Sequence, residues 1–390
     1  MKAILSVSLS ILIALFSLPM TTVHAEEKQA KSLVEDVKSA VLMEKDTGKV
    51  LYSIHPNKEL PPASMTKIMT LLLIFQALDR NEIALTDKVS VSEHAASMGG
   101  TQIFLEPGEE MTVEDLIKAI AIGSANDASM ALAEYIAGSE EAFVKRMNDE
   151  AKKLGLKHTH FSNPTGLPTE NHYSSAHDMA VMAKALLRYP DVLKYTSLYE
   201  DYLRENTDNK FWLVNTNKML KTYPGVDGLK TGYTQEAKYC LTATAKKNDM
   251  RVIAVVMGAP SAKERNKQVA KLLNYAFANY KTKKLVNQGQ AVAIVPVNKS
   301  EKGRVPAVTE DNAVLLLRKG ENAKDYHTKI EIKKNLAAPM EAGTVVGYYI
   351  VKKGQQTVSK TPLIVTRDIK KATWWQLFKR QIGKMTNGSW

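Results

Sequence analysis

Two apolar runs near the start of the chain and two in its middle have the length of buried strands. Residues 40–44 and 49–52 flank the turn-forming sequence Lys45–Gly48, a pattern that predicts a β-hairpin. Residues 241–245 and 252–257 have the same strand-like character. Helix-like segments lie between the two pairs. The pattern therefore predicts an α+β domain, in which a cluster of helices packs on an antiparallel sheet.

The expected helices begin at recognisable start signals. The first, from Ser64 to Leu78, is strongly apolar and follows Pro61-Pro62, a proline pair that interrupts regular secondary structure. A hydroxyl side chain followed three residues later by an acidic residue, or by a periodic apolar pattern, marks the others. These expected N-caps are Thr112, Ser139, Ser175 and Ser261, and the helix after Thr112 is expected to cover residues 116–122.

Beyond about Lys281 the pattern changes to short apolar runs separated by Gly, Pro, Asn and Lys. No catalytic spacing appears there. We therefore expect a small all-β domain over residues 282–366, after a larger domain over residues 26–281. Its expected strands are 291–297, 313–317, 328–332, 344–351 and 362–366.

The first 25 residues have the pattern of a secretory signal peptide. Lys2 precedes an apolar core over residues 11–18, and Val23-His24-Ala25 places small side chains one and three positions before a cleavage point. A membrane anchor is the alternative, but the apolar stretch is shorter than the roughly 20 residues that a span needs. We therefore expect export and cleavage after residue 25.

The last 24 residues, 367–390, predict an amphipathic helix. They carry a net charge of +5, a large part of the +12 of the whole chain. A basic helix with tryptophans on its apolar face is expected to lie in a membrane interface and to contact anionic lipids; packing on the protein's own core is the alternative. The apolar stripe consists of Trp374, Trp375, Leu377, Phe378, Ile382 and Met385, and Lys379, Arg380 and Lys384 lie opposite.

Composition adds two constraints. With 44% hydrophobic and 24% charged residues the chain is an ordinary globular one, and the 365 residues after the expected signal suit two domains. Cys240 is the sole cysteine, so an exported chain has no intrachain disulfide, and its place in a strand-like run favours a buried core residue over a nucleophile. An exported basic protein meets anionic lipids and wall polymers first, so no nucleic-acid partner is expected.

Ser64 and Lys67 form the first candidate for chemistry. They lie three residues apart at a helix start, so the amine reaches the hydroxyl on one helical face. A serine is a weak nucleophile unless a base takes its proton, and a lysine becomes such a base when burial or neighbouring cations lower its pKa. Alone this spacing is a weak signal, because Ser64 is equally suited to cap the helix.

Two further polar groups strengthen this interpretation. Ser124 and Asn126 interrupt an apolar helical stretch, where unpartnered polar groups cost free energy, so they are expected to face a cleft or to end one helix and cap the next. Lys230-Thr231-Gly232 has the character of a strand on which Lys230 supplies positive charge, Thr231 a hydroxyl donor and Gly232 room for a substrate backbone. An exposed hairpin is the alternative for this strand.

The three elements in this order are typical of penicillin-binding proteins and β-lactamases. The chain resembles the low-molecular-weight D,D-carboxypeptidases of that superfamily over nearly all of its mature length. The similarity extends to residues 63–70, 163–167, 172–180 and 226–234, to the β-rich second domain and to the tail.

The resemblance implies a role for each site residue. Ser64 forms the acyl-enzyme with Lys67 as its general base, Ser124 and Asn126 shape proton transfer, and Lys230 and Thr231 bind the substrate's terminal carboxylate. The backbone N–H groups of Ser64 and Tyr233 form the oxyanion hole, and Arg265 matches a position that helps to bind the carboxylate. One departure is Lys238, where many relatives have glycine.

The implied activity is removal of the terminal D-alanine from peptidoglycan pentapeptide stems, without cofactor or metal. β-Lactam antibiotics are the expected covalent inhibitors, and the outer face of the cytoplasmic membrane is the expected location. Three alternative functions remain open at this point. A β-lactamase of the related class would carry an additional glutamate, in a Glu-x-x-Leu-Asn run that residues 124–230 lack. A zinc peptidase would need a ligand set that the four histidines between residues 158 and 177 do not resemble. A non-catalytic penicillin-binding scaffold would keep the pocket without turnover.

Overall fold

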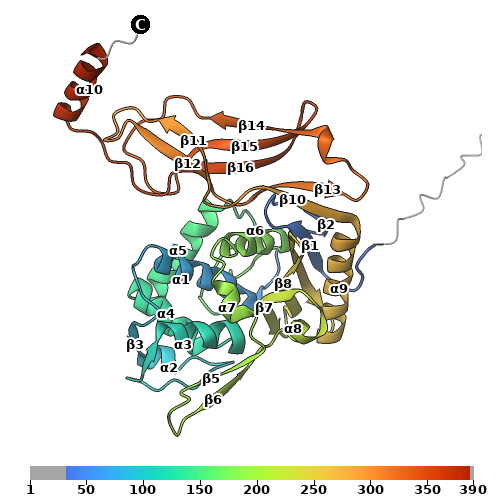
Figure 1. The fold of residues 1–390 in the computed structure, drawn as a ribbon. Helices are drawn as coiled ribbons and strands as arrows, with labels where there is room; N and C mark the ends of the chain where they lie inside the picture. Colours follow the sequence, from blue (N-terminus) through green and yellow to red (C-terminus); the bar gives the residue numbers. More distant parts are fainter. Residues whose placement is uncertain (1–31, 387–390) are drawn as a thin grey trace, which may run out of the picture. The chain divides into compact units, whose positions relative to one another are not determined.

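The structure, a computed structural model, describes residues 32–386 (Figure 1). The larger domain is built on a five-stranded antiparallel sheet in the order β2-β1-β9-β8-β7. Two of its strands come from the start of the chain and three from beyond residue 225, so the helical elements between residues 63 and 222 form one long insertion, as the sequence predicts. The strands are β1 (Ser39–Glu44), β2 (Val50–Ile54), β7 (Val226–Thr234), β8 (Lys238–Lys247) and β9 (Met250–Ala259).

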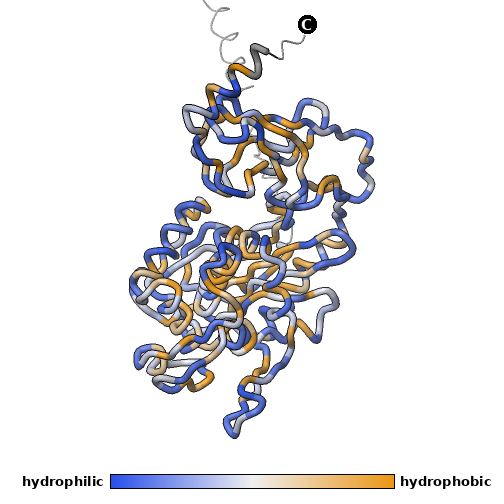
Figure 2. The backbone as a smooth tube through the Cα atoms, turned by 60° about the vertical axis from the view of Figure 1, so that its left-hand side comes forward, coloured by the Kyte–Doolittle hydropathy of each residue, from blue (hydrophilic) through white to orange (hydrophobic). Residues whose placement is uncertain are grey.

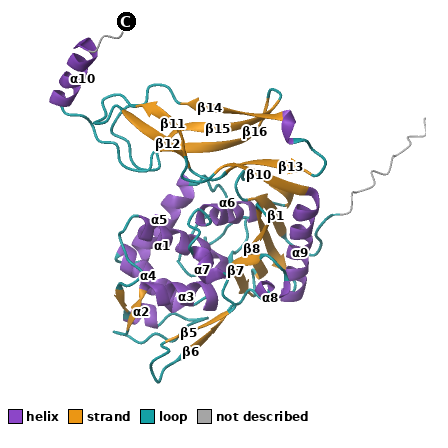
Figure 3. Cartoon of the chain, viewed as in Figure 1, coloured by secondary structure: helices purple, strands orange, loops and turns teal. Residues whose placement is uncertain are grey.

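Helices pack on both faces of this sheet (Figure 3). Helix α9 (Ala262–Asn279) contacts β8 and β9, and helix α6 (Ala176–Leu186) contacts β1 and β9 from the other face. In Figure 2 the apolar stretches gather inside the domain, while polar residues predominate at its turns. The remaining helical elements of the insertion are η1 (Ala63–Thr66), α1 (Lys67–Asp79), α2 (Glu93–Ala96), α3 (Val113–Lys118), η2 (Ala119–Gly123), α4 (Asn126–Ala137), α5 (Glu140–Lys153), α7 (Val192–Thr196) and α8 (Met219–Thr222).

The predicted helix starts are confirmed. The side chains of Thr112, Ser139, Ser175 and Ser261 each accept a hydrogen bond from the backbone N–H three residues later. Two predicted helices differ in detail: the one expected at Ser64 begins as the 3-10 turn η1, and the one expected over 116–122 ends in the π turn η2. Two small two-stranded sheets were not predicted, because their strands of three or four residues leave no periodic pattern. They are β3 (Lys88–Ser90) with β4 (Glu110–Thr112), and β5 (Glu200–Leu203) with β6 (Phe211–Val214).

The second domain is all-β, as predicted. A five-stranded sheet has the order β11-β12-β16-β15-β14, and β10 pairs with β13. Strands β10 and β12 were missed, because β10 is rich in lysine and β12 contains Pro306; the boundary expected after residue 281 falls inside β10. The strands are β10 (Tyr280–Val286), β11 (Ala291–Pro296), β12 (Arg304–Thr309), β13 (Ala313–Arg318), β14 (Tyr326–Ile332), β15 (Val345–Lys353) and β16 (Gln356–Ile364), with the short turn η3 (Ala323–Asp325) before β14.

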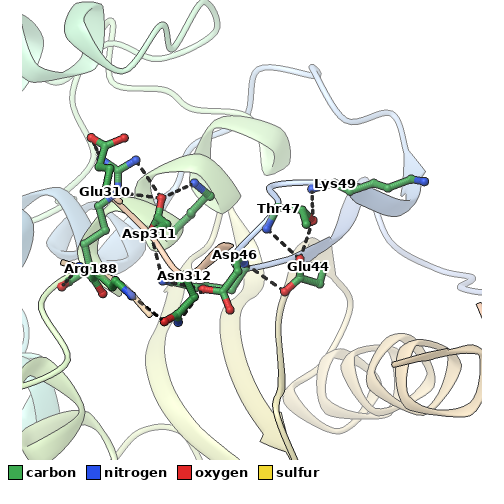
Figure 4. A network of polar contacts seen from close by, with 11 residues as sticks. Glu44, Asp46, Thr47, Lys49, Arg188, Glu310, Asp311 and Asn312 are labelled. Carbon is green, nitrogen blue, oxygen red and sulfur yellow. Dashed lines mark hydrogen bonds and ion pairs between the residues drawn. The ribbon is translucent and has the colours of Figure 1, made fainter. Parts of the chain in front are cut away.

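A buried ionic network links the loop after β12 to the larger domain (Figure 4). Asp311 is 1% exposed and accepts hydrogen bonds from Lys45 at 3.2 Å, Lys184 at 2.9 Å and the Nε of Arg188 at 3.3 Å. These cations hold the pKa of Asp311 down at about 2, against the opposing effect of its burial. Arg188 also pairs with Glu310 at 2.8 Å. One carboxylate therefore joins the β1–β2 turn, the end of α6 and the second domain.

The chain continues into helix α10 (Trp374–Thr386). Trp374, Trp375, Phe378 and Ile382 are exposed on it, and the rings of Trp374 and Phe378 stack at 5.1 Å. Arg380 instead donates hydrogen bonds to the carbonyl oxygens of Ser300 and Glu301. Among the helices within residues 32–386, none has both the length and the apolar character needed to cross a bilayer. The predicted signal peptide lies outside the described residues.

Candidate active site

Ser64 lies on the turn η1, between the Pro61-Pro62 pair and the first residue of α1. It is half-buried, so its hydroxyl is within reach of solvent. The residue before it, Ala63, has a φ of 49°, in the left-handed region that is costly for an alanine. Gly166 packs directly on this strained residue: a Cβ at Gly166 would lie 1.9 Å from the carbonyl oxygen of Ala63. Close backbone packing therefore holds the strained turn in place.

Lys67 begins α1 and is fully buried, with 0% of its surface exposed. Among the described residues, three oxygens lie within hydrogen-bond distance of its Nζ. They are Ser64 Oγ at 3.3 Å, Asn126 Oδ1 at 2.6 Å and the carbonyl oxygen of Thr165 at 2.7 Å. The predicted Ser64–Lys67 pair is thus in contact, and Asn126 joins it from another helix.

The electrostatic surroundings favour the neutral form of Lys67. Burial lowers the pKa of its amine well below the usual value, and the nearby cation of Lys230 lowers it further, while Asp127 acts weakly in the other direction. A neutral amine has two N–H donors and one lone pair. The oxygens of Asn126 and Thr165 can only accept, so they take the two donors, and the lone pair is left for the hydroxyl proton of Ser64. This geometry allows Lys67 to act as a base toward Ser64.

Ser124 and Asn126 lie where the π turn η2 ends and α4 begins. Both side chains are buried, and Ser124 adopts a φ of 67°, which ends η2 and lets the chain change direction. Asn126 donates from Nδ2 to the carbonyl oxygen of Gly99 while its Oδ1 accepts from Lys67. Asp127 accepts hydrogen bonds from the backbone N–H groups of Ile103 and Leu105, which fixes the loop beside Asn126. The interruption of the apolar stretch is thus a helix break that brings the Asn126 side chain to Lys67.

Strand β7 carries Lys230, Thr231 and Gly232 in a row along the edge of the sheet. A Cβ at Gly232 would lie 2.7 Å from the carbonyl oxygen of Pro62, so a side chain there would collide with the turn that carries Ser64. The Thr231 hydroxyl donates to Thr216 at 2.7 Å. The close approach of β7 to η1 explains the need for glycine, and it brings the third motif to the first.

Two buried basic residues, Lys230 and Arg265, lie near this edge of the sheet. Lys230 is 1% exposed, and within residues 32–386 it forms no ion pair with Asp or Glu. Burial first, and then the nearby Arg265, lower the pKa of Lys230 to about 7. Arg265, on α9, is also buried, and its described hydrogen bonds go to the neutral side chain of Asn266. Two buried cations without a counter-ion provide a site for an anionic group.

Comparison with known proteins gives a family with these motifs. A family of D-alanyl-D-alanine carboxypeptidases matches residues 24–261, and the C-terminal domain of penicillin-binding protein 5 matches residues 280–371. The D-alanyl-D-alanine carboxypeptidase DacF of Bacillus subtilis is 54% identical over 386 residues, which is 99% of each chain. The chain belongs to this family.

Solved structures agree with the assignment. Penicillin-binding protein 5 from Haemophilus influenzae superposes with a TM-score of 0.67 at 32% identity, over 86% of this chain and 98% of that one. Penicillin-binding protein D2 from Listeria monocytogenes, solved in an ampicillin-bound form, matches 62% of this chain and 98% of its own with a TM-score of 0.56 and 32% identity. The D2 match covers less of this carboxypeptidase than the match to penicillin-binding protein 5 does. The predicted family and two-domain fold are therefore confirmed.

Lys238, the departure from the family pattern, has a φ of 57° at the β7–β8 turn. This is the left-handed region that favours glycine, so the backbone retains the shape that glycine suits while carrying a lysine. Its neighbour Tyr239 stacks on Tyr233 with ring centroids 4.5 Å apart, and Tyr233 is exposed beside the site. The departure therefore lies at the β7–β8 turn, next to Tyr239.

Three contributors to the site were not recognised from the sequence. The carbonyl oxygen of Thr165, the carboxylate of Asp127 and the hydroxyl of Thr216 contact the predicted residues or their supports. A backbone carbonyl leaves no sequence signal, although Thr165 lies in a segment that resembles the family.

The four clustered histidines contact different groups. His158 pairs with Glu59, His177 with Asp178, and His160 with the carbonyl oxygen of Asn171. His172 lies against Thr66 and Ser162. Within residues 32–386, no group of three or more His, Cys, Asp or Glu side chains is arranged to hold a metal ion.

Proposed function

We propose that Ser64 is the nucleophile of this serine-type D-Ala-D-Ala carboxypeptidase and that Lys67 is its general base. The observation that carries the proposal is the contact of the buried Lys67 amine, whose pKa is lowered by burial and by Lys230, with the Ser64 hydroxyl at 3.3 Å. The carbonyl carbon of the penultimate D-alanine is attacked by Ser64 Oγ while Lys67 takes the proton. The C–N bond then breaks, and the amine of the terminal D-alanine receives a proton. Free D-alanine departs, and the rest of the stem peptide remains bound to Ser64 as an ester.

Hydrolysis completes the cycle. Water adds to the ester carbonyl, Ser64 regains its hydroxyl proton, and the stem peptide departs one residue shorter with a new carboxylate. Ser124 and Asn126 shape these proton transfers, since Asn126 orients the Lys67 amine and Ser124 lies at the adjacent helix break. The backbone N–H groups of Ser64 and Tyr233 stabilise the oxyanion in both steps. The glycine at position 232 supports this assignment, because β7 approaches the turn closely there.

The terminal carboxylate of the substrate is bound by Lys230, Thr231 and Arg265. Lys230 and Arg265 are buried and have no carboxylate partner among the described residues, and the Thr231 hydroxyl lies on the same strand as Lys230. A substrate carboxylate supplies the missing counter-ion. It also returns the pKa of Lys230 toward its usual value, so that this lysine is a full cation when substrate is bound. This requirement restricts the enzyme to the free C-terminus of a stem peptide.

β-Lactam antibiotics acylate the same serine. The relative from Listeria monocytogenes was solved in an ampicillin-bound form, and the lactam carboxylate and carbonyl suit the same cationic and oxyanion positions.

The tail then holds the enzyme at an anionic membrane surface after export through the signal at residues 1–25. Helix α10 supports this role, because Trp374, Trp375 and Phe378 are exposed together while Arg380 is turned to carbonyl oxygens of the second domain. A chain ending at residue 372 should keep its peptidase activity and lose binding to vesicles that contain phosphatidylglycerol.

The test of the chemistry is release of D-alanine from a synthetic pentapeptide that ends in D-Ala-D-Ala. The wild type releases D-alanine, and Ser64→Ala does not, while a peptide amidated at its C-terminus is a poor substrate. Prompt hydrolysis of penicillin by the wild type would favour a β-lactamase instead. Binding of penicillin without release of D-alanine would favour the non-catalytic scaffold.

A further inference from the structure

The turn η1, which carries Ser64, is stabilised by contacts with other segments of the chain. Neither η1 nor the start of α1 has a side-chain cap, and the strained Ala63 lies within this turn. Strand β7 packs against one side of it, and a second set of supporting contacts comes from residues 162–173, which we call the strap. Thr165 accepts from Lys67, Pro164 accepts from the Thr70 hydroxyl at 2.6 Å, and Gly166 packs on Ala63.

His172, at the end of the strap, contacts the last residue of the turn η1. Its Nε2 lies 2.7 Å from the hydroxyl of Thr66, the residue between Met65 and Lys67. The backbone N–H of Ser162 donates to Nδ1 of the same ring at 3.0 Å. Thr66 is fully buried, His172 is nearly so, and the Phe161 ring packs edge-on against the imidazole at 5.8 Å. The ring is therefore fixed in place on both of its nitrogens.

These contacts assign the proton on the ring. A backbone N–H can only donate, so Nδ1 must be the unprotonated nitrogen and Nε2 must carry the hydrogen. Burial first, and then the nearby His160, lower the pKa of His172 to about 4, so the ring is neutral at neutral pH. Nε2–H therefore donates to Thr66 Oγ1, and the bond has a defined direction from the strap to the catalytic turn.

We propose that His172 is a positioning residue for acylation, which acts through Thr66 to hold Ser64 and Lys67 in their reactive arrangement. This inference rests on the proposed roles of Ser64 and Lys67. Thr66 is the residue next to the base and two residues after the nucleophile, so a shift of its side chain moves the turn between them. Substrate binding depends on Lys230 and Arg265, which lie on β7 and α9. Loss of the His172–Thr66 bond is therefore expected to lower kcat and the acylation rate more than it raises KM.

The experiment compares variants of the full chain in acylation by a fluorescent penicillin and in D-alanine release. His172→Phe keeps a ring against Phe161 but removes the donor, and we expect acylation to slow by about tenfold to a hundredfold with KM changed by less than about threefold. His172→Gln supplies an amide N–H donor and should recover most of the rate. Thr66→Val should reproduce the loss, and the double variant His172→Phe/Thr66→Val should be no slower than either single one, because both remove the same bond. His160→Phe, two residues before the strap and exposed, is the matched control and should match the wild type.

Each outcome has one meaning. Wild-type acylation by His172→Phe, or multiplication of the two single effects in the double variant, would overturn the inference. So would an equal loss in His172→Gln, because a donor would then not be what matters. Thermal unfolding of each variant shows whether the lost rate only follows lost folded protein; if His172→Phe does not fold, Thr66→Val and Thr66→Ser make the same comparison. If Ser64→Ala still acylates, the proposed function itself has failed, whatever the His172 variants do.

Discussion

Asp311 allows the most quantitative test of how the two domains are held together. The residue is 1% exposed, and three cations from the larger domain surround its carboxylate. The substitution Asp311→Asn preserves the size of the side chain and removes its charge. It leaves Lys184 without its carboxylate partner, whereas Lys45 keeps Asp46 and Arg188 keeps Glu310.

The expected magnitude follows from the pKa. A displacement from the usual 3.8 to about 2 corresponds to about 2.5 kcal/mol of stabilisation of the ionised form at neutral pH. Removing one partner of a buried ion pair costs about 3–5 kcal/mol when the remaining charges are left uncompensated. Since two of the three cations here keep a second partner, we expect a loss of about 2–4 kcal/mol in the free energy of unfolding.

The pH dependence has a defined sign. The folded-state pKa of Asp311 lies below the unfolded value, so the unfolded chain binds a proton first as the pH falls. The contribution of Asp311 is therefore complete above about pH 4 and is lost between about pH 4 and pH 2. Asp311→Asn should lack this component of acid destabilisation.

Urea unfolding followed by tryptophan fluorescence at pH 7 measures the effect, because Trp212 lies in the larger domain and Trp374 and Trp375 lie beyond the second. Glu310→Gln is the matched control: Glu310 is next in sequence, pairs with the same Arg188 and is more exposed, so its loss should cost less than about 1 kcal/mol. Equal stability of Asp311→Asn and Glu310→Gln would refute the reasoning. Acylation by penicillin should be unchanged in both variants, because the network does not include the residues around Ser64.

Four further predictions concern the active site. Gly166→Ala forces a Cβ against the Ala63 carbonyl at a φ of 84°, so we expect a severe loss of several kcal/mol in unfolding free energy and of penicillin labelling. His172 has a folded-state pKa of about 4 against a usual 6.5, so about 3 kcal/mol of stability should disappear as the pH falls from about 6.5 to 4, and urea unfolding of His172→Gln should lack this loss. Because the pKa of Lys67 is held far below its usual value, acylation by the wild type should persist at neutral pH, whereas Lys67→Ala should be slower by at least about a hundredfold in stopped-flow labelling. Arg265→Gln should lower kcat/KM for peptides with a free C-terminal carboxylate by about 5-fold to 100-fold and leave kcat/KM for amidated peptides unchanged.

The sequence predicted the layout of the larger domain because its signals are local and strong. Runs such as 252–257 are buried on both faces and read as continuous apolar segments, and hydroxyl caps such as Ser139 mark helix starts. The same reasoning failed where tertiary contacts decide. Strand β10 is lysine-rich and is formed by pairing with β13, and the π turn before Ser124 has the same apolar pattern as an α-helix.

The candidate site was predictable in its residues and not in its contacts. Ser64, Lys67 and Asn126 meet as their motifs suggest, because a helix spacing of three and a helix break both have fixed geometry. The carbonyl oxygen of Thr165 had no such signal, since any residue type offers a carbonyl. His172 belongs to a family-like segment and to the four clustered histidines, but its contact with Thr66 spans 106 residues of sequence and leaves no local signal.

The central claim is that Ser64 performs the peptidase reaction with Lys67 as its base. Its most direct test is release of D-alanine from a D-Ala-D-Ala pentapeptide by the wild type and by Ser64→Ala at equal concentrations of folded protein. The account predicts steady release by the wild type and none above background by the variant. Equal release by the two proteins would contradict it.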